Sequence, residues 1–108
     1  MKSFSETIQI EFDDNNILSS LFGINDSNIR ILEKINEVKI QYRGNKVKII
    51  GKKLSIEETR RELENLFEDA KKGIEIDEEK IKDTKSLLSL DINVNSQLLF
   101  SFVESNLG

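Results

Sequence analysis

The stretch that most constrains the fold of this chain is VKIQYRGNKVKIIGKK, residues 38–53. Apolar and polar residues alternate on both sides of Gly44-Asn45, which is the period of a half-buried β-strand. A glycine between two such runs adopts the positive φ of a two-residue turn without steric cost. The sequence therefore predicts a β-hairpin whose strands are residues 38–43 and 46–50.

A two-residue turn also determines which residues of the hairpin lie opposite each other. Arg43 pairs with Lys46, and the pairing continues outward from the turn until Lys39 lies opposite Ile50. One face of the hairpin is then apolar and turned toward helices, with Tyr42 buried in it. The opposite face carries four cations, Lys39, Arg43, Lys46 and Lys48.

The charge of this stretch permits two interpretations. It holds six basic residues and no acidic one, although the formal net charge of the chain is −4; the six are Lys39, Arg43, Lys46, Lys48, Lys52 and Lys53. Such a surface binds phosphates of a nucleic acid with release of counterions. The alternative is an ordinary solvated strand face, whose lysines deter edge-to-edge aggregation. No exposed aromatic side chain is expected nearby for base stacking, so the residues alone leave both interpretations open.

The segments before the hairpin predict one strand and two helices. Residues 7–12 alternate between apolar and polar, which is typical of a strand. The polar run 13–16 ends that strand and caps a short helix that stops at Gly23 in the left-handed region. A second helix begins with one of residues 25–27 as its cap and ends near Asn36.

Two further helices are predicted after the hairpin. Ser55 and Glu58 have the spacing of a capping box, which opens the longest helix. That helix ends at Lys71-Lys72-Gly73, where two cations precede a glycine. Asp77 caps a weaker helix through about residue 88, with few apolar contacts, namely Ile81, Leu87 and Leu88.

The element order is β-α-α-β-β-α followed by a C-terminal helical extension. This order predicts an α+β domain over residues 1–88, in which helices cover one face of a three-stranded antiparallel sheet. Residues 89–108 read as a linker or tail. Their apolar patch, residues 98–103, has no evident partner in the domain, which indicates an interaction with further chain or another subunit.

The sequence offers no chemistry for catalysis. The chain lacks both cysteine and histidine. The carboxylate clusters 13–14 and 77–79 suit helix capping, and the Gly51-Lys52-Lys53 run lacks the earlier glycine and the following Ser or Thr of a phosphate-binding loop. We therefore expect no catalytic residue, metal site or cofactor in this chain. No apolar run reaches the length of a signal peptide or membrane span, so a cytoplasmic protein without membrane contact is expected.

The predicted order of elements resembles a K-homology (KH) RNA-binding domain of the first type. Residues 21–51, LFGINDSNIRILEKINEVKIQYRGNKVKIIG, resemble the N-terminal region of PhoH-family proteins, the phosphate-starvation-inducible ATPases. In that family a Leu-Phe-Gly, an acidic-polar loop, a helix, a strand, an Arg-Gly-Asn and a second strand recur in this order. The likeness extends over residues 6–88.

The resemblance implies a bacterial cytoplasmic protein in which a KH-like module precedes a P-loop ATPase domain with a role in RNA metabolism. ATP and Mg²⁺ belong to that ATPase domain, which is absent here, so the chain is expected to be a fragment or a truncated gene product. The Gly-x-x-Gly loop of KH domains corresponds to Gly23, Ile24, Asn25 and Asp26. A carboxylate in place of the second glycine repels phosphate and puts the usual RNA groove in doubt.

Two functions are therefore predicted from the sequence. The first is an RNA-binding accessory module of a PhoH-like ATPase, which uses the six basic residues of the hairpin region. The second is a protein-interaction or oligomerisation module that positions the ATPase domain and has no RNA affinity. In that case the basic face meets an acidic helix, such as residues 57–69 of a neighbouring copy.

Overall fold

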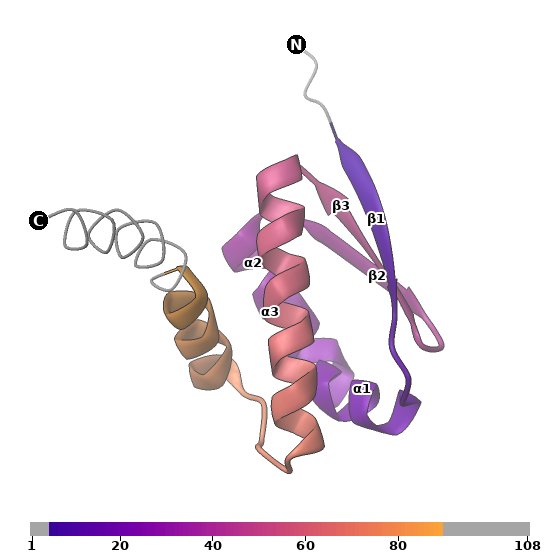
Figure 1. Ribbon diagram of the computed structural model, residues 1–108, viewed down its shortest axis with the longest axis vertical. Coiled ribbons are helices and arrows are strands. Elements are labelled where there is room, and N and C mark those ends of the chain that lie inside the picture. Colours follow the sequence, from indigo (N-terminus) through magenta and orange to yellow (C-terminus); the bar gives the residue numbers. More distant parts are fainter. Residues whose placement is uncertain (1–4, 90–108) are drawn as a thin grey trace, which may run out of the picture.

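The computed structural model describes residues 5–89 as an α+β domain, which confirms the predicted fold class. Helices lie on one face of a three-stranded antiparallel sheet, and no element of residues 5–89 covers the other, here called the open face (Figure 1). The strands, in spatial order, are β1 (Glu6–Glu11), β3 (Lys46–Gly51) and β2 (Lys39–Arg43). The labelled helices are α1 (Asn15–Phe22), α2 (Ser27–Asn36) and α3 (Lys53–Lys71), with a short 3₁₀ turn η1 (Ile24–Asp26) and a further helical stretch over residues 78–89.

The hairpin of β2 and β3 has the predicted register. Arg43 lies opposite Lys46, and the pairing runs without a bulge to Lys39 opposite Ile50. Gly44 has a φ of 61°, and Asn45 is not among the residues with positive φ, as in a type II′ turn. β1 adds to the far side of β3, so β3 is the central strand.

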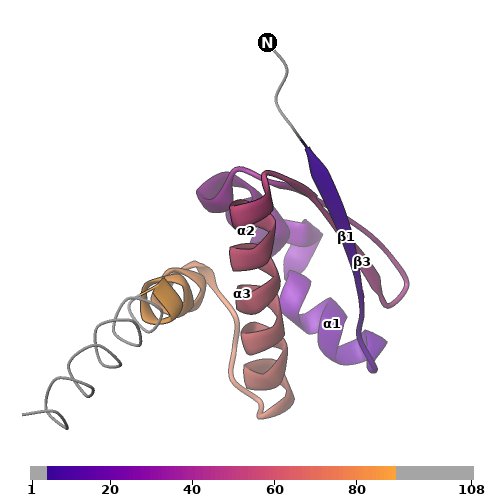
Figure 2. The ribbon, with the colours of Figure 1, turned by 45° about the horizontal axis from the view of Figure 1, so that its top comes forward.

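The core lies between the sheet and the helices, which form a second layer (Figure 2). Alternate residues of each strand point into it, and the helices contribute one apolar face each. Its most deeply buried apolar side chains are Leu18, Leu21, Leu32, Val47, Ile49, Ile56, Leu63, Leu66 and Ile81. Three of these residues, Ile56, Leu63 and Leu66, come from the inner face of α3.

The predicted capping box of that helix is wrong. α3 begins at Lys53, two residues before Ser55, and the first helical hydrogen bond joins the Ile56 N–H to the Lys52 carbonyl at 2.9 Å. Gly51 packs so closely on Val38 that a Cβ there would lie 3.0 Å from Val38 Cγ1. Only Lys52 separates the end of β3 from the start of α3, so Ser55 falls within the first turn.

The C-terminal helical stretch is capped as predicted but packs differently. The Asp77 carboxylate accepts the Lys80 N–H at 2.8 Å, and Ile81 is fully buried. Leu87 is 63% exposed, so its predicted apolar contact is wrong, because residues 81, 84 and 88 form the inward face. Residue 89, the first residue of the predicted tail, belongs to this helical stretch, and residues 90–108, including the apolar patch 98–103, lie outside the described residues.

Candidate nucleic-acid interface

The open face of the sheet gathers residues from all three strands. Directly opposite residues of antiparallel strands point to the same side, so the pairing defines three cross-strand rows. In the order β1, β3, β2, the rows are Thr7–Ile50–Lys39, Gln9–Lys48–Gln41 and Glu11–Lys46–Arg43. All of these residues are exposed except Ile50, which is half-buried.

Four of the predicted site residues are brought together on this face: Lys39, Arg43, Lys46 and Lys48. Neighbouring strands lie about 4.8 Å apart, so the side chains are close enough to contact one phosphate backbone together. None of the four forms an ion pair with another residue in the 5–89 range. The face is therefore a concentration of cations that the domain leaves without salt bridges.

The two remaining predicted lysines lie at the end of this face. Lys52 is exposed, and its backbone is extended, with φ −73° and ψ 151°. It therefore continues the alternation of β3 on the same side as Lys46 and Lys48. Lys53 is exposed and is the first residue of α3.

Glu11 is a member of this face that the sequence did not reveal. It lies opposite Lys46, in the same row as Arg43, and supplies a negative charge beside the two cations. The alternation of residues 7–12 places Glu11 on the polar side of its strand. Its neighbours depend on the strand order, however, which no local pattern encodes.

The loop of residues 23–26, which the sequence predicted to match the KH Gly-x-x-Gly, is strained. Asn25 and Asp26 have φ values of 55° and 59°, in the left-handed region that non-glycine residues seldom adopt. The first helix ends at Gly23 as predicted, and Gly23 has a positive φ of 82°. Its ψ of 176° is extended, so Gly23 does not have the predicted left-handed helical conformation. Ile24 between them is 84% exposed. Asp26 is the N-cap of α2, yet its side chain makes no capping hydrogen bond.

The Asp26 carboxylate binds Tyr42 instead. The Tyr42 hydroxyl donates to the two carboxylate oxygens at 2.8 and 2.9 Å, and this hydrogen bond raises the pKa of Tyr42. The predicted burial of Tyr42 is wrong: its side chain lies on the helix side of the sheet but is 42% exposed, because β2 is an edge strand. Its ring centroid lies 4.3 Å from that of Phe22.

These contacts lie at a hollow in the surface. A hollow of about 180 Å³ lies between α1, the loop and the start of the hairpin turn, and Phe22, Asp26, Tyr42 and Gly44 are among its lining residues. The carboxylate and the phenol meet across it. The structure thus places the Asp26 carboxylate at the hollow beside this loop.

A buried polar cluster ties three helical segments together, and sequence patterns did not reveal it. The Asn36 amide donates to the Glu62 carboxylate at 2.8 Å, and the Lys85 ammonium donates to the Asn36 carbonyl oxygen at 2.6 Å. Glu62 is 2% exposed, and this burial raises its pKa, although Asn36 and Lys85 act in the opposite direction.

The residues described by the structure contain no group of three or more acidic, histidine or cysteine side chains that could hold a metal ion. No helix in residues 5–89 combines the length and the apolar character needed to cross a membrane. Comparison with family models, with curated proteins and with solved structures gave no match. The resemblance to PhoH-family proteins therefore stays a prediction from residues 6–88.

Proposed function

We propose that this chain is a non-catalytic accessory module that binds RNA through the open face of its sheet. The observation that carries the proposal is the presence of Lys39, Arg43, Lys46 and Lys48 on one uncovered face without an ion pair among the described residues. Cations arranged in this way exchange their counterions for phosphates. Glu11 is the single acid in the three rows, so the face keeps a net positive charge.

The face supports recognition of the backbone and not of bases. The aromatic side chains in the described range, Phe12, Phe22, Tyr42 and Phe67, lie in the core or on the helix side of the sheet. No aromatic ring is therefore available there for base stacking. We expect weak, sequence-tolerant binding to single-stranded or structured RNA, with a strong dependence on salt.

The element order and the antiparallel sheet support a KH-like fold of the first type, as in the N-terminal region of PhoH-like ATPases. The contact between Asp26 and Tyr42 argues that the usual KH groove is not the binding surface, since phosphate avoids a fixed carboxylate. In this proposal the chain is a cytoplasmic bacterial module that delivers RNA to an ATPase domain. ATP and Mg²⁺ would be bound by that domain.

The proposal is tested by titrating a labelled uridine oligonucleotide and a labelled RNA hairpin with the protein at low and high salt. Replacement of Lys46 and Lys48 by Glu should abolish the anisotropy change at low salt. A double variant with Lys34→Glu and Lys72→Glu has the same net charge at two other exposed positions and should bind almost normally. The logarithm of affinity should fall with the logarithm of salt by about one unit per phosphate contacted.

Unchanged RNA affinity in the Lys46 and Lys48 variant would show that the open face is not the RNA-binding surface. Equal loss in both double variants would indicate a response to total charge alone. Absence of RNA binding together with salt-dependent growth of mass in light scattering would support the interaction module that positions the ATPase domain. Each outcome distinguishes between the two functions predicted from the sequence.

A further inference from the structure

Strand β1 has an edge on which the described part of the domain places nothing. The strand order is β1-β3-β2, so one side of β1 pairs with β3 and the other side is free. The Phe12 N–H donates to the Asn45 carbonyl at 2.9 Å, which directs even-numbered residues of this strand toward β3. Backbone groups alternate along a strand, so the N–H groups of Thr7, Gln9 and Glu11 point outward. No hydrogen bond within residues 5–89 occupies these three donors.

The opposite edge of the sheet, formed by β2, has a side-chain partner. On β2 the outward Ile40 N–H donates to the Glu33 carboxylate of α2 at 2.8 Å. A side chain of the domain thus occupies one outward donor of that edge, which is one way in which proteins hinder strand addition. The Tyr42 N–H is the other outward donor of β2 and has no hydrogen bond within residues 5–89, so β2 keeps one donor available whereas β1 keeps three.

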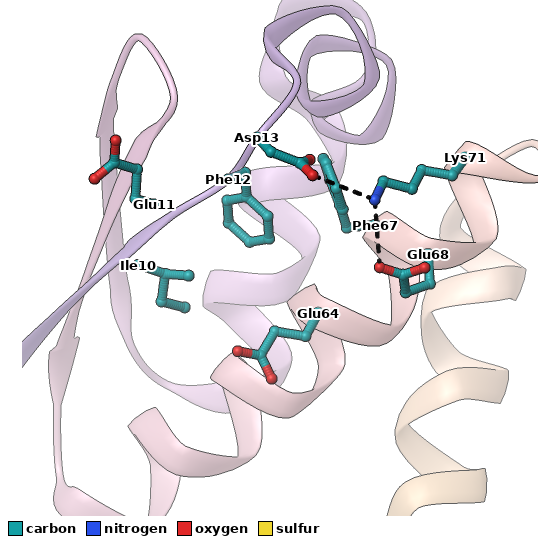
Figure 3. A pocket seen from close by; sticks show the side chains of 8 residues that line it. All are labelled: Ile10, Glu11, Phe12, Asp13, Glu64, Phe67, Glu68 and Lys71. Atoms are coloured by element: carbon teal, nitrogen blue, oxygen red, sulfur yellow. Dashed lines mark ion pairs between the residues drawn. The ribbon is translucent and has the colours of Figure 1, made fainter.

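A groove runs beside the free edge, between β1 and α3 (Figure 3). Its volume is about 440 Å³. Ile10, Phe12 and Phe67 form its apolar part, with the two phenyl rings 4.7 Å apart. Four carboxylates and one ammonium surround them: Glu11, Asp13, Glu64, Glu68 and Lys71. The groove therefore combines an apolar floor with an excess of negative charge.

The contacts of Lys71 show that this groove accommodates a cationic side chain. Its ammonium lies 5.1 Å from the centre of the Phe67 ring, between Asp13 at 3.6 Å and Glu68 at 3.7 Å. These ion pairs are long and largely exposed, so they contribute little to stability and a competing cation displaces them at low cost. A lysine or arginine of a partner gains the same combination of ring face and carboxylates.

We propose that β1 accepts an extended, lysine- or arginine-bearing segment of a partner protein as a fourth strand of the sheet. Backbone hydrogen bonds to Thr7, Gln9 and Glu11 supply the pairing. Every second side chain of the added strand enters the groove, where its aliphatic stem packs on Ile10 beside the buried rings of Phe12 and Phe67 and its charged end reaches Glu64 or Glu68. This surface shares Thr7, Gln9 and Glu11 with the open face but uses their backbone groups and the groove on the helix side, and none of the four cations, so the inference does not rest on RNA binding.

The proposal is tested with a short labelled peptide in which valine and lysine alternate. Nuclear magnetic resonance should locate the largest amide shifts at Thr7, Gln9 and Glu11, with further shifts along α3. Two control peptides separate the contributions. One has glutamate in place of lysine, and the other has a central proline that keeps the charge but interrupts strand pairing. Both should bind at least about tenfold more weakly than the parent peptide.

A protein variant with Glu64→Lys and Glu68→Lys reverses the charge of the groove at two exposed positions and should bind the parent peptide at least about tenfold more weakly. A variant with Glu75→Lys and Glu79→Lys makes the same change in net charge outside the groove and should bind normally. Equal binding of the proline peptide would overturn strand addition, and equal binding of the glutamate peptide would overturn the charge selection. Absence of any amide shift with the parent peptide would overturn both.

Discussion

At the scale of single residues, Glu62 occupies an environment that a surface carboxylate does not meet. It is 2% exposed on the inner face of α3, and Asn36 and Lys85 are its polar partners. Glu58 adds a like charge on the solvent side of the same lysine. Burial is the largest influence and raises the pKa of Glu62 above its ordinary value of 4.5. The folded chain therefore holds this proton more tightly than the unfolded chain does.

This shift predicts a pH dependence of stability. The contribution of Glu62 is fully present below a pH of about 4.5 and is lost as the pH rises through the raised pKa, because the carboxylate must then ionise while buried. Glu62→Gln removes the titration and keeps an acceptor for the Asn36 amide. In urea unfolding from pH 4 to pH 8, the stability of the original chain should fall relative to that of the variant. Parallel curves would contradict the raised pKa.

At the scale of elements, the turn of the hairpin is tied to the end of β1. The Asn45 side-chain amide donates to the Phe12 carbonyl at 2.6 Å, while the Asn45 carbonyl accepts the Phe12 N–H at 2.9 Å. A second, longer contact of 3.5 Å joins the same amide to Glu11. Within the Arg-Gly-Asn run, glycine provides the positive φ and asparagine the clamp to β1.

Asn45→Asp tests this clamp. A carboxylate cannot donate to the Phe12 carbonyl and places a negative charge beside Glu11, so the free energy of unfolding should fall by about 1–3 kcal/mol. Asn45→Ala loses the same hydrogen bond without the added charge and should cost less. Unfolding in urea at low and high salt measures both, and only the aspartate variant should recover at high salt. Identical stability of the three proteins would show that the clamp contributes nothing.

At the scale of the whole molecule, the C-terminal helical stretch is part of the folded core. Ile81 is fully buried, the Lys80 ammonium lies 3.0 Å from the Asp69 carboxylate, and the Asn28 amide donates to the Ile76 carbonyl at 2.9 Å. The cluster of Asn36, Glu62 and Lys85 adds a polar contact to α2 and α3. The helical layer is therefore completed by residues 76–85, and these residues belong to the domain.

Ile81→Ala should lower the free energy of unfolding by about 2–5 kcal/mol, since it leaves a cavity at a fully buried position. Leu87→Ala on the same helical stretch changes a side chain that is 63% exposed and should cost less than about 0.5 kcal/mol. Thermal unfolding measures the difference. Hydrogen exchange should show faster opening of residues 78–89 in the first variant. Equal effects of the two substitutions would contradict the docking of this helix.

The sequence predicted the hairpin, its register and the four cations of the open face, because alternation and a two-residue turn are local properties. It also predicted a helix cap within residues 13–16, which the structure places at Asp14, and the cap at Asp77. The capping box at Ser55 was wrong because α3 begins two residues earlier, at Lys53, and the burial of Tyr42 was wrong because β2 is an edge strand.

The sequence by itself determined the elements and the side of each strand on which its charges lie, since both follow from the two periods of backbone geometry. Only the tertiary structure decided which charged and polar side chains lie next to each other. The strand order sets Glu11 beside Lys46, the fold of the loop joins Asp26 to Tyr42, and helix packing buries Glu62 against Lys85. These pairs are separated by 16 to 35 residues along the chain, as their numbering shows, and contacts at such separation arise from packing and not from local sequence. The same packing leaves β1 with the free edge for which we propose a partner.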